Sequence, residues 1–103
     1  MTDDEDLEAV DMPADPPDEH WVKADLALAI KRRIAEKRLT QAKAAAVMGE
    51  TQPNVSAIVR GRLEAFSLDR LMHHLTTLGF DVVVTIKEAQ LGKCHGRLAV
   101  RTL

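Results

Sequence analysis

The polar side chains best placed for chemistry lie in residues 39–62, LTQAKAAAVMGETQPNVSAIVRGR. Gln52, Asn54 and Ser56 alternate there within five positions. Glutamine and asparagine amides can donate and accept hydrogen bonds together, which suits the N6/N7 edge of adenine, and a serine hydroxyl is adaptable. The chemistry that these residue types favour is therefore hydrogen bonding to the edges of bases.

Other residues of the same stretch are candidates for phosphate contacts. Gln41 begins a predicted helix, whose first N–H groups and amide can approach a phosphate. The basic residues near the end of the stretch can reach phosphates too, although an arginine at a helix C-terminus also stabilises the helix dipole. The complete set of candidate DNA-binding residues is Gln41, Lys43, Thr51, Gln52, Pro53, Asn54, Ser56, Ala57, Arg60 and Arg62.

No catalytic residue, metal site or cofactor is expected. Cys94 and His95 form a lone pair, and a metal site would need at least two more ligands at suitable spacing. His73 and His74 are adjacent in the sequence, so they cannot share one helix face, and we expect them at the surface or in an interface. Because spacing assembles no nucleophile, base and orienting group, the chain is predicted not to be an enzyme.

Charge is distributed unevenly along the chain. The first twenty residues contain nine acidic residues, three prolines and no lysine or arginine, which predicts a disordered tail. Residues 21–103 contain 14 basic and seven acidic residues, so their formal charge is +7 although that of the whole chain is −2. This cationic part is compatible with nucleic-acid binding. The sequence has neither a long apolar run nor a basic export signal, so we expect a cytoplasmic protein without a membrane span.

The elements that must position the polar residues are short helices. Apolar residues at helical spacing predict a first helix from about Lys23 to Lys37, with Trp21 and Val22 ahead of it and packed on its first turn. Three consecutive basic residues of this helix are expected to form a solvated face: Lys31, Arg32 and Arg33.

The next two predicted helices are separated by a glycine. Thr40 is expected to cap a helix over Gln41 to Met48, which Gly49 ends in a left-handed conformation. Thr51 is expected to cap the following helix, which runs to about Arg60. Helices this short are not stable alone. A short connection with glycine makes them cross steeply, as in a helix-turn-helix whose second helix enters the major groove.

The same arrangement predicts which side chains face inward. Val55 and Ile58 follow Gly49 by six and nine residues, so both are expected to point into the core. The small side chain of Ala45 is expected where the two helices approach closest. The polar residues at the start of the helix that follows Thr51 are then expected to face outward.

A fourth helix and a change of period follow. Ser67 is expected to cap a helix with a leucine stripe, which Gly79 closes. Residues 80–87 then alternate apolar and polar side chains, which predicts a strand, and residues 97–101 repeat the pattern more briefly. A single strand needs a partner. Two partners remain open: residues 97–101 of the same chain, or residues 80–87 of a second subunit.

These residues resemble the helix-turn-helix of the Cro and lambda-repressor type, the XRE family. The resemblance covers residues 23–87 and departs from the family at Glu50, in a turn position that is usually apolar, and at Ala44, which replaces a larger aliphatic residue. It rests on Leu39-Thr40-Gln41-Ala42, Ala45, Met48-Gly49, Thr51-Gln52-Pro53-Asn54-Val55-Ser56 and Gly61. More narrowly, Phe66-Ser67-Leu68-Asp69-Arg70-Leu71 and Leu78-Gly79-Phe80-Asp81-Val82 resemble the subfamily that includes HigA-type antitoxins.

The resemblance implies a mostly α, lambda-repressor-like fold of four to five helices with a C-terminal β-strand or hairpin. Together with the composition and the apolar patterns, it divides the chain into an acidic tail (1–20), a helix-turn-helix DNA-binding domain (21–79) and a C-terminal dimerisation segment (80–103). Family members bind palindromic operators in double-stranded DNA as homodimers. HigA-type members also repress their own operon and bind a small basic RelE/HigB-like toxin.

We therefore expect a sequence-specific transcriptional regulator, more narrowly an autorepressing HigA-like antitoxin. Three alternatives stay open. The chain could be a toxin-binding module for which DNA binding is secondary, or a stand-alone phage-type repressor. It could also serve as an adaptor that uses the strand edge and the leucine helix.

Overall fold

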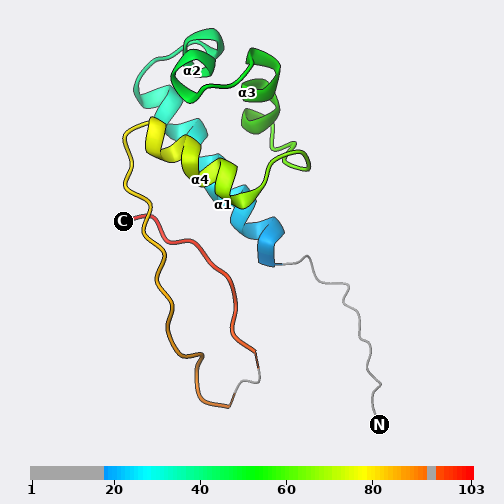
Figure 1. Ribbon diagram of the computed structural model, residues 1–103, viewed down its shortest axis with the longest axis vertical. Helices are drawn as coiled ribbons and strands as arrows, with labels where there is room; N and C mark the ends of the chain where they lie inside the picture. Colours follow the sequence, from blue (N-terminus) through cyan, green and yellow to red (C-terminus); the bar gives the residue numbers. More distant parts are fainter. Residues whose placement is uncertain (1–17, 93–94) are drawn as a thin grey trace.

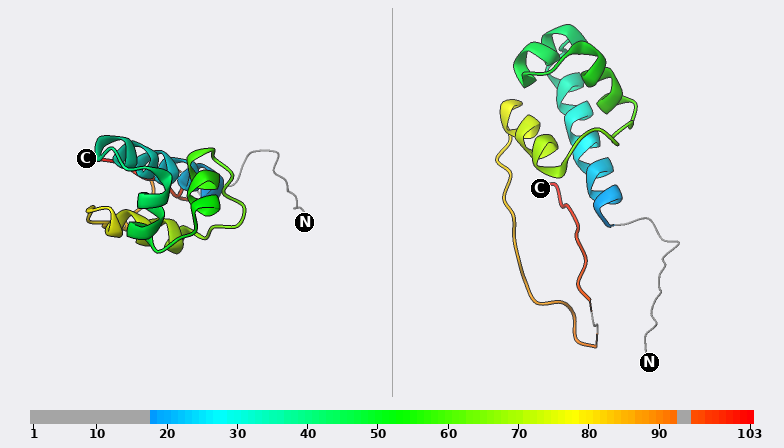
Figure 2. Two further views of the ribbon diagram at one scale, coloured as in Figure 1. Left: turned by 90° about the horizontal axis from the view of Figure 1, so that it is seen from above. Right: turned by 45° about the vertical axis from the view of Figure 1, so that its right-hand side comes forward.

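The computed structural model describes residues 18–92 and 95–103, and this part of the chain folds into four α-helices (Figure 1). They are α1 (Asp18–Glu36), α2 (Gln41–Met48), α3 (Gln52–Val59) and α4 (Leu68–Thr77). α4 packs along α1, while α2 and α3 form a pair at one end of these two helices (Figures 1 and 2). The prediction of a mostly α fold with a helix-turn-helix is confirmed.

α1 begins earlier than the sequence pattern predicts. Asp18 and Glu19 occupy its first turn, where carboxylates interact favourably with the positive end of the helix dipole. The prediction that Trp21 and Val22 precede the helix is wrong, because both lie inside it: Val22 is buried and Trp21 is 56% exposed. The rest of the predicted acidic tail, residues 1–17, lies outside the described residues.

One hydrophobic core joins the four helices. Burying one large apolar side chain contributes about 1.5–3 kcal/mol to folding, and this core keeps the eight-residue helices α2 and α3 helical. Val55 and Ile58 are among its members, as predicted, and the leucine stripe of α4 faces it. The largest fully buried side chains are Ile30, Val55, Ile58, Leu71 and Leu78.

Arg33 does not belong to a solvated face, which corrects the prediction for the three basic residues of α1. Its guanidinium carbon lies 3.7 Å from the centroid of the Phe80 ring, and its Nη1 donates a hydrogen bond to the Leu78 carbonyl at 3.0 Å. The chain turns there at Gly79, whose φ is +95°. Arg33 therefore fastens the end of α4 to α1, whereas Lys31 and Arg32 are exposed as predicted.

The predicted C-terminal strand is not formed. Residues 80–87 and 97–101 have no regular secondary structure, and the described part of the chain contains no strand. In Figures 1 and 2 the chain runs away from the helices after α4 and returns through residues 95–103. There the Leu98 N–H donates a hydrogen bond to Asp18 Oδ2 at 3.0 Å, so this segment contacts α1. An alternating pattern makes a strand only when a neighbour completes the hydrogen-bond ladder.

Two further predictions concern a membrane span and Cys94. Within residues 18–92 and 95–103, no helix is long and apolar enough to cross a membrane. Cys94, for which we expect no metal role, lies outside the described residues.

Candidate nucleic-acid interface

Two threonine caps define where the short helices begin. Thr40 Oγ1 accepts a hydrogen bond from the backbone N–H of Lys43 at 3.1 Å, at the start of α2. Thr51 Oγ1 accepts one from the backbone N–H of Asn54 at 3.2 Å, at the start of α3. Both caps satisfy N–H groups that lack a partner inside the helix, as the sequence predicts.

The turn between α2 and α3 depends on Gly49. Its φ of +70° lies in the left-handed region, which favours glycine, and the next N–H, that of Glu50, bonds to the Ala45 carbonyl at 2.9 Å. Ala45 and Met48 are buried on α2 beside the turn. Ala44 is 0% exposed, so α2 packs fully against the core despite its small side chains.

The ten candidate DNA-binding residues differ in exposure. Six of them are exposed: Lys43, Thr51, Gln52, Pro53, Arg60 and Arg62. Four are half-buried: Gln41, Asn54, Ser56 and Ala57. The first turn of α3 thus presents the Gln52 amide to solvent, while the Asn54 side chain is turned partly toward the protein. Ala57 packs against the hydrophobic core, which makes it the least available of the set.

Glu50, in the turn ahead of α3, has a side chain that is 5% exposed and binds three others. Its Oε1 accepts hydrogen bonds from Asn54 Nδ2 at 2.8 Å and from Arg70 at 2.8 Å. Its Oε2 accepts one from Arg70 Nε at 2.7 Å and lies 2.7 Å from His74 Nε2. We call these four residues the Glu50 cluster. It links the turn, the first turn of α3 and α4 through one carboxylate.

The cluster keeps the Glu50 carboxylate ionised. Burial raises the pKa of this carboxyl, but the hydrogen bonds from Asn54, Arg70 and His74 together lower it by more than burial raises it. The pKa of Glu50 therefore lies below the ordinary value of 4.5. The charge also lies just ahead of the N-terminus of α3, where a negative charge interacts favourably with the helix dipole.

The position of His74 corrects the prediction of a surface or interface residue. Its side chain is 3% exposed and faces Glu50, whereas His73 is exposed. The sequence does contain a signal for this contact. A charged residue at a usually apolar turn position needs a buried partner, and Arg70 and His74 are spaced four apart on one face of α4.

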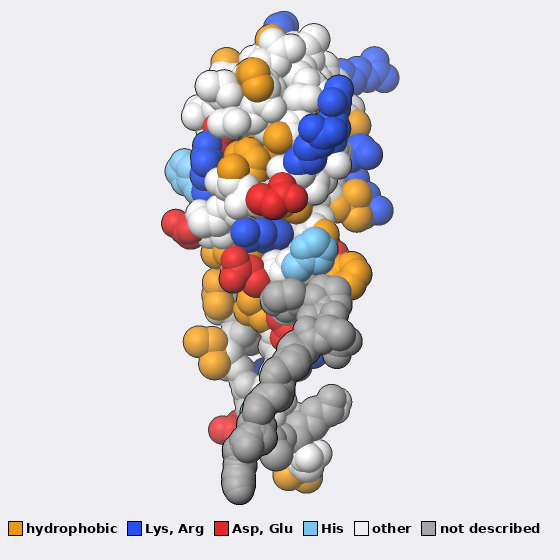
Figure 3. Space-filling view, turned by 90° about the vertical axis from the view of Figure 1, so that its right-hand side faces the viewer, with side chains coloured by type: hydrophobic (Ala, Val, Ile, Leu, Met, Phe, Trp, Pro, Cys, Tyr) orange, Lys and Arg blue, Asp and Glu red, His pale blue; other side chains and the backbone are white. Residues whose placement is uncertain are grey.

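Exposed basic side chains precede and follow α3 in the sequence. Lys43 precedes it in α2, while Arg60 and Arg62 follow it, and all three are exposed. On the face shown in Figure 3, the uppermost part of the helical body carries lysine and arginine side chains, and most of the acidic side chains lie below them. This distribution suits contact with a polyanion.

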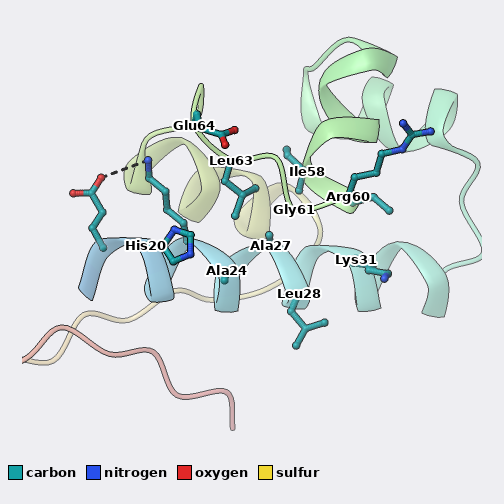
Figure 4. A pocket seen from close by; sticks show the side chains of 13 residues that line it. His20, Ala24, Ala27, Leu28, Lys31, Ile58, Arg60, Gly61, Leu63 and Glu64 are labelled. Carbon is teal, nitrogen blue, oxygen red and sulfur yellow. Dashed lines mark ion pairs between the residues drawn. The ribbon is translucent and has the colours of Figure 1, made fainter. Parts of the chain in front are cut away.

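A groove lies beside the end of α3, between α1 and the connection to α4 (Figure 4). Leu63 points across it toward α1, and Ile58 lines it from α3. Acidic and basic side chains both line it, and Glu19 and Lys23 pair with each other at 3.5 Å. Because its charges are mixed, the groove favours no particular ligand, and the exposed front of α3 is the better candidate for a nucleic-acid interface.

Comparisons with known proteins agree with this geometry. A family model described as a helix-turn-helix domain matches residues 9–87. The chain is also similar to a solved structure assigned to the XRE family of transcriptional regulators, with 38% identity over 84% of this chain and 97% of that chain, and a TM-score of 0.78. A comparison with curated proteins gives no match. The matched residues include α2, α3 and every member of the Glu50 cluster.

Proposed function

The chain belongs to the XRE-type helix-turn-helix family, and from this premise we propose that it is a sequence-specific DNA-binding transcriptional regulator. The observation that carries the proposal is the first turn of α3, which is exposed at Gln52 and held by the cap and the turn behind it. In a helix-turn-helix protein this turn enters the major groove and contacts base edges.

Affinity and selectivity come from different residues in this proposal. The N-terminus of α2, with Gln41 and Lys43, and the arginines after α3, Arg60 and Arg62, contact phosphates, which position the protein without reading sequence. Gln52, Asn54 and Ser56 read base edges from α3. Thr51 and Pro53 are exposed at the same end of α3, whereas Ala57, which packs partly against the core, contributes least.

The decisive experiment is a footprint on the DNA upstream of the chain's own gene, followed by gel shifts in the presence of excess random DNA. We expect one protected site that competes well against random DNA. Equal affinity for that site and for random DNA would contradict sequence-specific regulation and would favour an adaptor role.

We further propose that the regulator is a homodimer on a palindromic operator. Two copies related by a twofold axis place their α3 helices about 34 Å apart, one turn of DNA. Residues 80–103 are the proposed dimerisation segment, because Val83, Val84 and Ile86 are 80%, 72% and 93% exposed. Three apolar side chains exposed to this extent within four consecutive residues favour contact with a second chain.

The narrower proposal is an autorepressing HigA-like antitoxin that neutralises a small basic RelE/HigB-like toxin. Seven acidic residues precede α1 and support it, because such a segment complements a basic partner and can fold on binding. Removal of residues 1–17 tests the idea while leaving α1 intact. Loss of toxin neutralisation with intact operator binding would support it. Operator binding with no basic toxin encoded beside the gene would favour a stand-alone repressor instead.

A further inference from the structure

The Asn54 amide has one neighbour that determines its orientation. Its Nδ2 donates a hydrogen bond to Glu50 Oε1 at 2.8 Å. An ionised carboxylate can only accept hydrogen bonds, so the amide must turn its NH₂ group toward Glu50. A flipped amide would place its own oxygen against the carboxylate, and neither atom carries a proton to share. The Asn54 Oδ1 therefore lies on the side of the amide away from Glu50.

The rest of the Glu50 cluster holds the carboxylate in place. Arg70 contacts both of its oxygens, and His74 lies against Oε2. The Arg70 guanidinium is itself placed over the Phe66 ring, with 4.8 Å from its carbon to the ring centroid. Because both partners come from α4 and the His74 side chain is 3% exposed, the carboxylate is held from the side of the core, and it holds the Asn54 amide in turn.

We propose that Glu50 is a positioning residue for base recognition, and that through it Asn54 presents Oδ1 as a hydrogen-bond acceptor to the major groove. This inference rests on the proposed DNA binding and names the class of base that is read. In the major groove adenine offers the N6 amino group and cytosine the N4 amino group, whereas guanine and thymine place a carbonyl oxygen at the equivalent position. Because Oδ1, and not the second Nδ2 hydrogen, faces the base in this proposal, Asn54 selects an adenine or a cytosine at one position of each half-site.

The fixed amide also explains the acidic residue in the turn. A flexible asparagine can rotate its amide to suit a donor or an acceptor, so it selects weakly. An amide held before binding loses less conformational freedom when it meets the base, and it cannot rotate to accept guanine or thymine. The negative charge of Glu50 does not repel the DNA phosphates strongly, because the carboxylate is buried and paired with Arg70.

The test is selection of preferred sites from a half-site library with the full-length chain, for wild type, Glu50→Gln, Asn54→Ala and the double variant. We expect wild type to favour adenine or cytosine over guanine and thymine by about fivefold or more at one position, the lower end of what a base-edge contact contributes. Asn54→Ala should lose this preference and thereby identify the position. Glu50→Gln should lose it too, and in the Asn54→Ala background it should change nothing further at that position.

A preference that survives Glu50→Gln would overturn the inference, and so would an effect of Glu50→Gln that persists when Asn54 is alanine. Wild type without any base preference would instead refute the proposed function. Nuclear magnetic resonance provides a second readout in wild type if Glu50→Gln does not fold. The Asn54 side-chain amide proton that is bonded to Glu50 should exchange slowly with water in the free protein, and exchange of both amide protons as fast as those of the exposed Gln90 amide would overturn the proposal.

Discussion

Arg70 of α4 forms an ion pair with Glu50, with Arg70 Nη2 2.6 Å from Glu50 Oε2, and this contact links α4 to the turn that precedes α3. Most of the fold is held by apolar packing, which is not directional. This contact is directional, because a guanidinium binds a carboxylate in a fixed plane. The orientation of α3 relative to α4 is therefore determined partly by one polar contact.

Replacing Glu50 by alanine should lower the free energy of unfolding by about 1–3 kcal/mol, because it leaves Asn54, Arg70 and His74 without their common acceptor. The loss should stay below that of a fully buried ion pair, since Arg70 is 40% exposed and can regain water. Urea unfolding followed by circular dichroism measures it. Glu64→Ala, at an exposed site, is the control and should change the value by less than about 0.5 kcal/mol.

The stabilisation by Glu50 should depend on pH. Its pKa in the folded protein lies below the ordinary 4.5, so the unfolded chain binds a proton first as the pH falls. The stability advantage of wild type over Glu50→Gln should therefore be complete above about pH 4.5 and disappear as the pH falls through the lower folded pKa. Asp69, whose pKa a hydrogen bond from Ser67 lowers, is present in both proteins and cancels in the difference. An advantage that is constant from pH 7 to pH 3 would contradict this account.

Gln52→Ala should weaken operator binding on the order of 1–3 kcal/mol and relax base choice at one position of each half-site. The reason is its place at the exposed start of α3, where the amide can reach a base edge. Gel shifts on the operator and on single-base variants measure both effects. Gln90→Ala makes the same chemical change at an exposed site outside the helices, and it should bind like wild type. Equal binding by the two variants would remove Gln52 from the readout.

Arg60 and Arg62 should contribute to affinity through phosphates alone. Changing both to glutamine should reduce the slope of log K against log salt by about 2 in magnitude, one per lost phosphate contact in a half-site, with base preferences unchanged. Fluorescence anisotropy on a half-site duplex at several salt concentrations gives the slope. Arg101→Gln removes an exposed arginine from the C-terminal segment and should leave it as in wild type. A changed base preference would instead assign these arginines to readout.

Sequence patterns predicted the helix-turn-helix well because its determinants are local. Thr40 and Thr51 cap the helices by bonding an N–H three residues ahead, and Gly49 supplies the left-handed turn. Val55 and Ile58 follow from helical spacing. Each of these features is decided within a few residues, so the printed sequence contains what is needed to predict it.

The missed features depend on contacts between distant residues. Arg33 contacts Phe80 and Leu78, and Glu50 contacts Arg70 and His74. Each pair is separated by twenty or more positions in the sequence. Charge alone assigns such side chains to the surface. The strand failed for a related reason: residues 80–87 have the right alternation, but a strand also needs a neighbour that the pattern does not supply.

The alternating face of residues 80–87 yields the last prediction. Phe80 and Val82 are half-buried against the helices, while Ile86, on the same side of an extended chain, is 93% exposed. A second copy that covers this side would bury Ile86, so Ile86→Lys should weaken the dimer. Analytical ultracentrifugation should show more monomer, and affinity for the full palindrome should fall more than affinity for a half-site. Thr85→Lys adds the same charge on the opposite side and should leave the dimer intact. If both variants dimerise like wild type, α4 or another surface forms the interface.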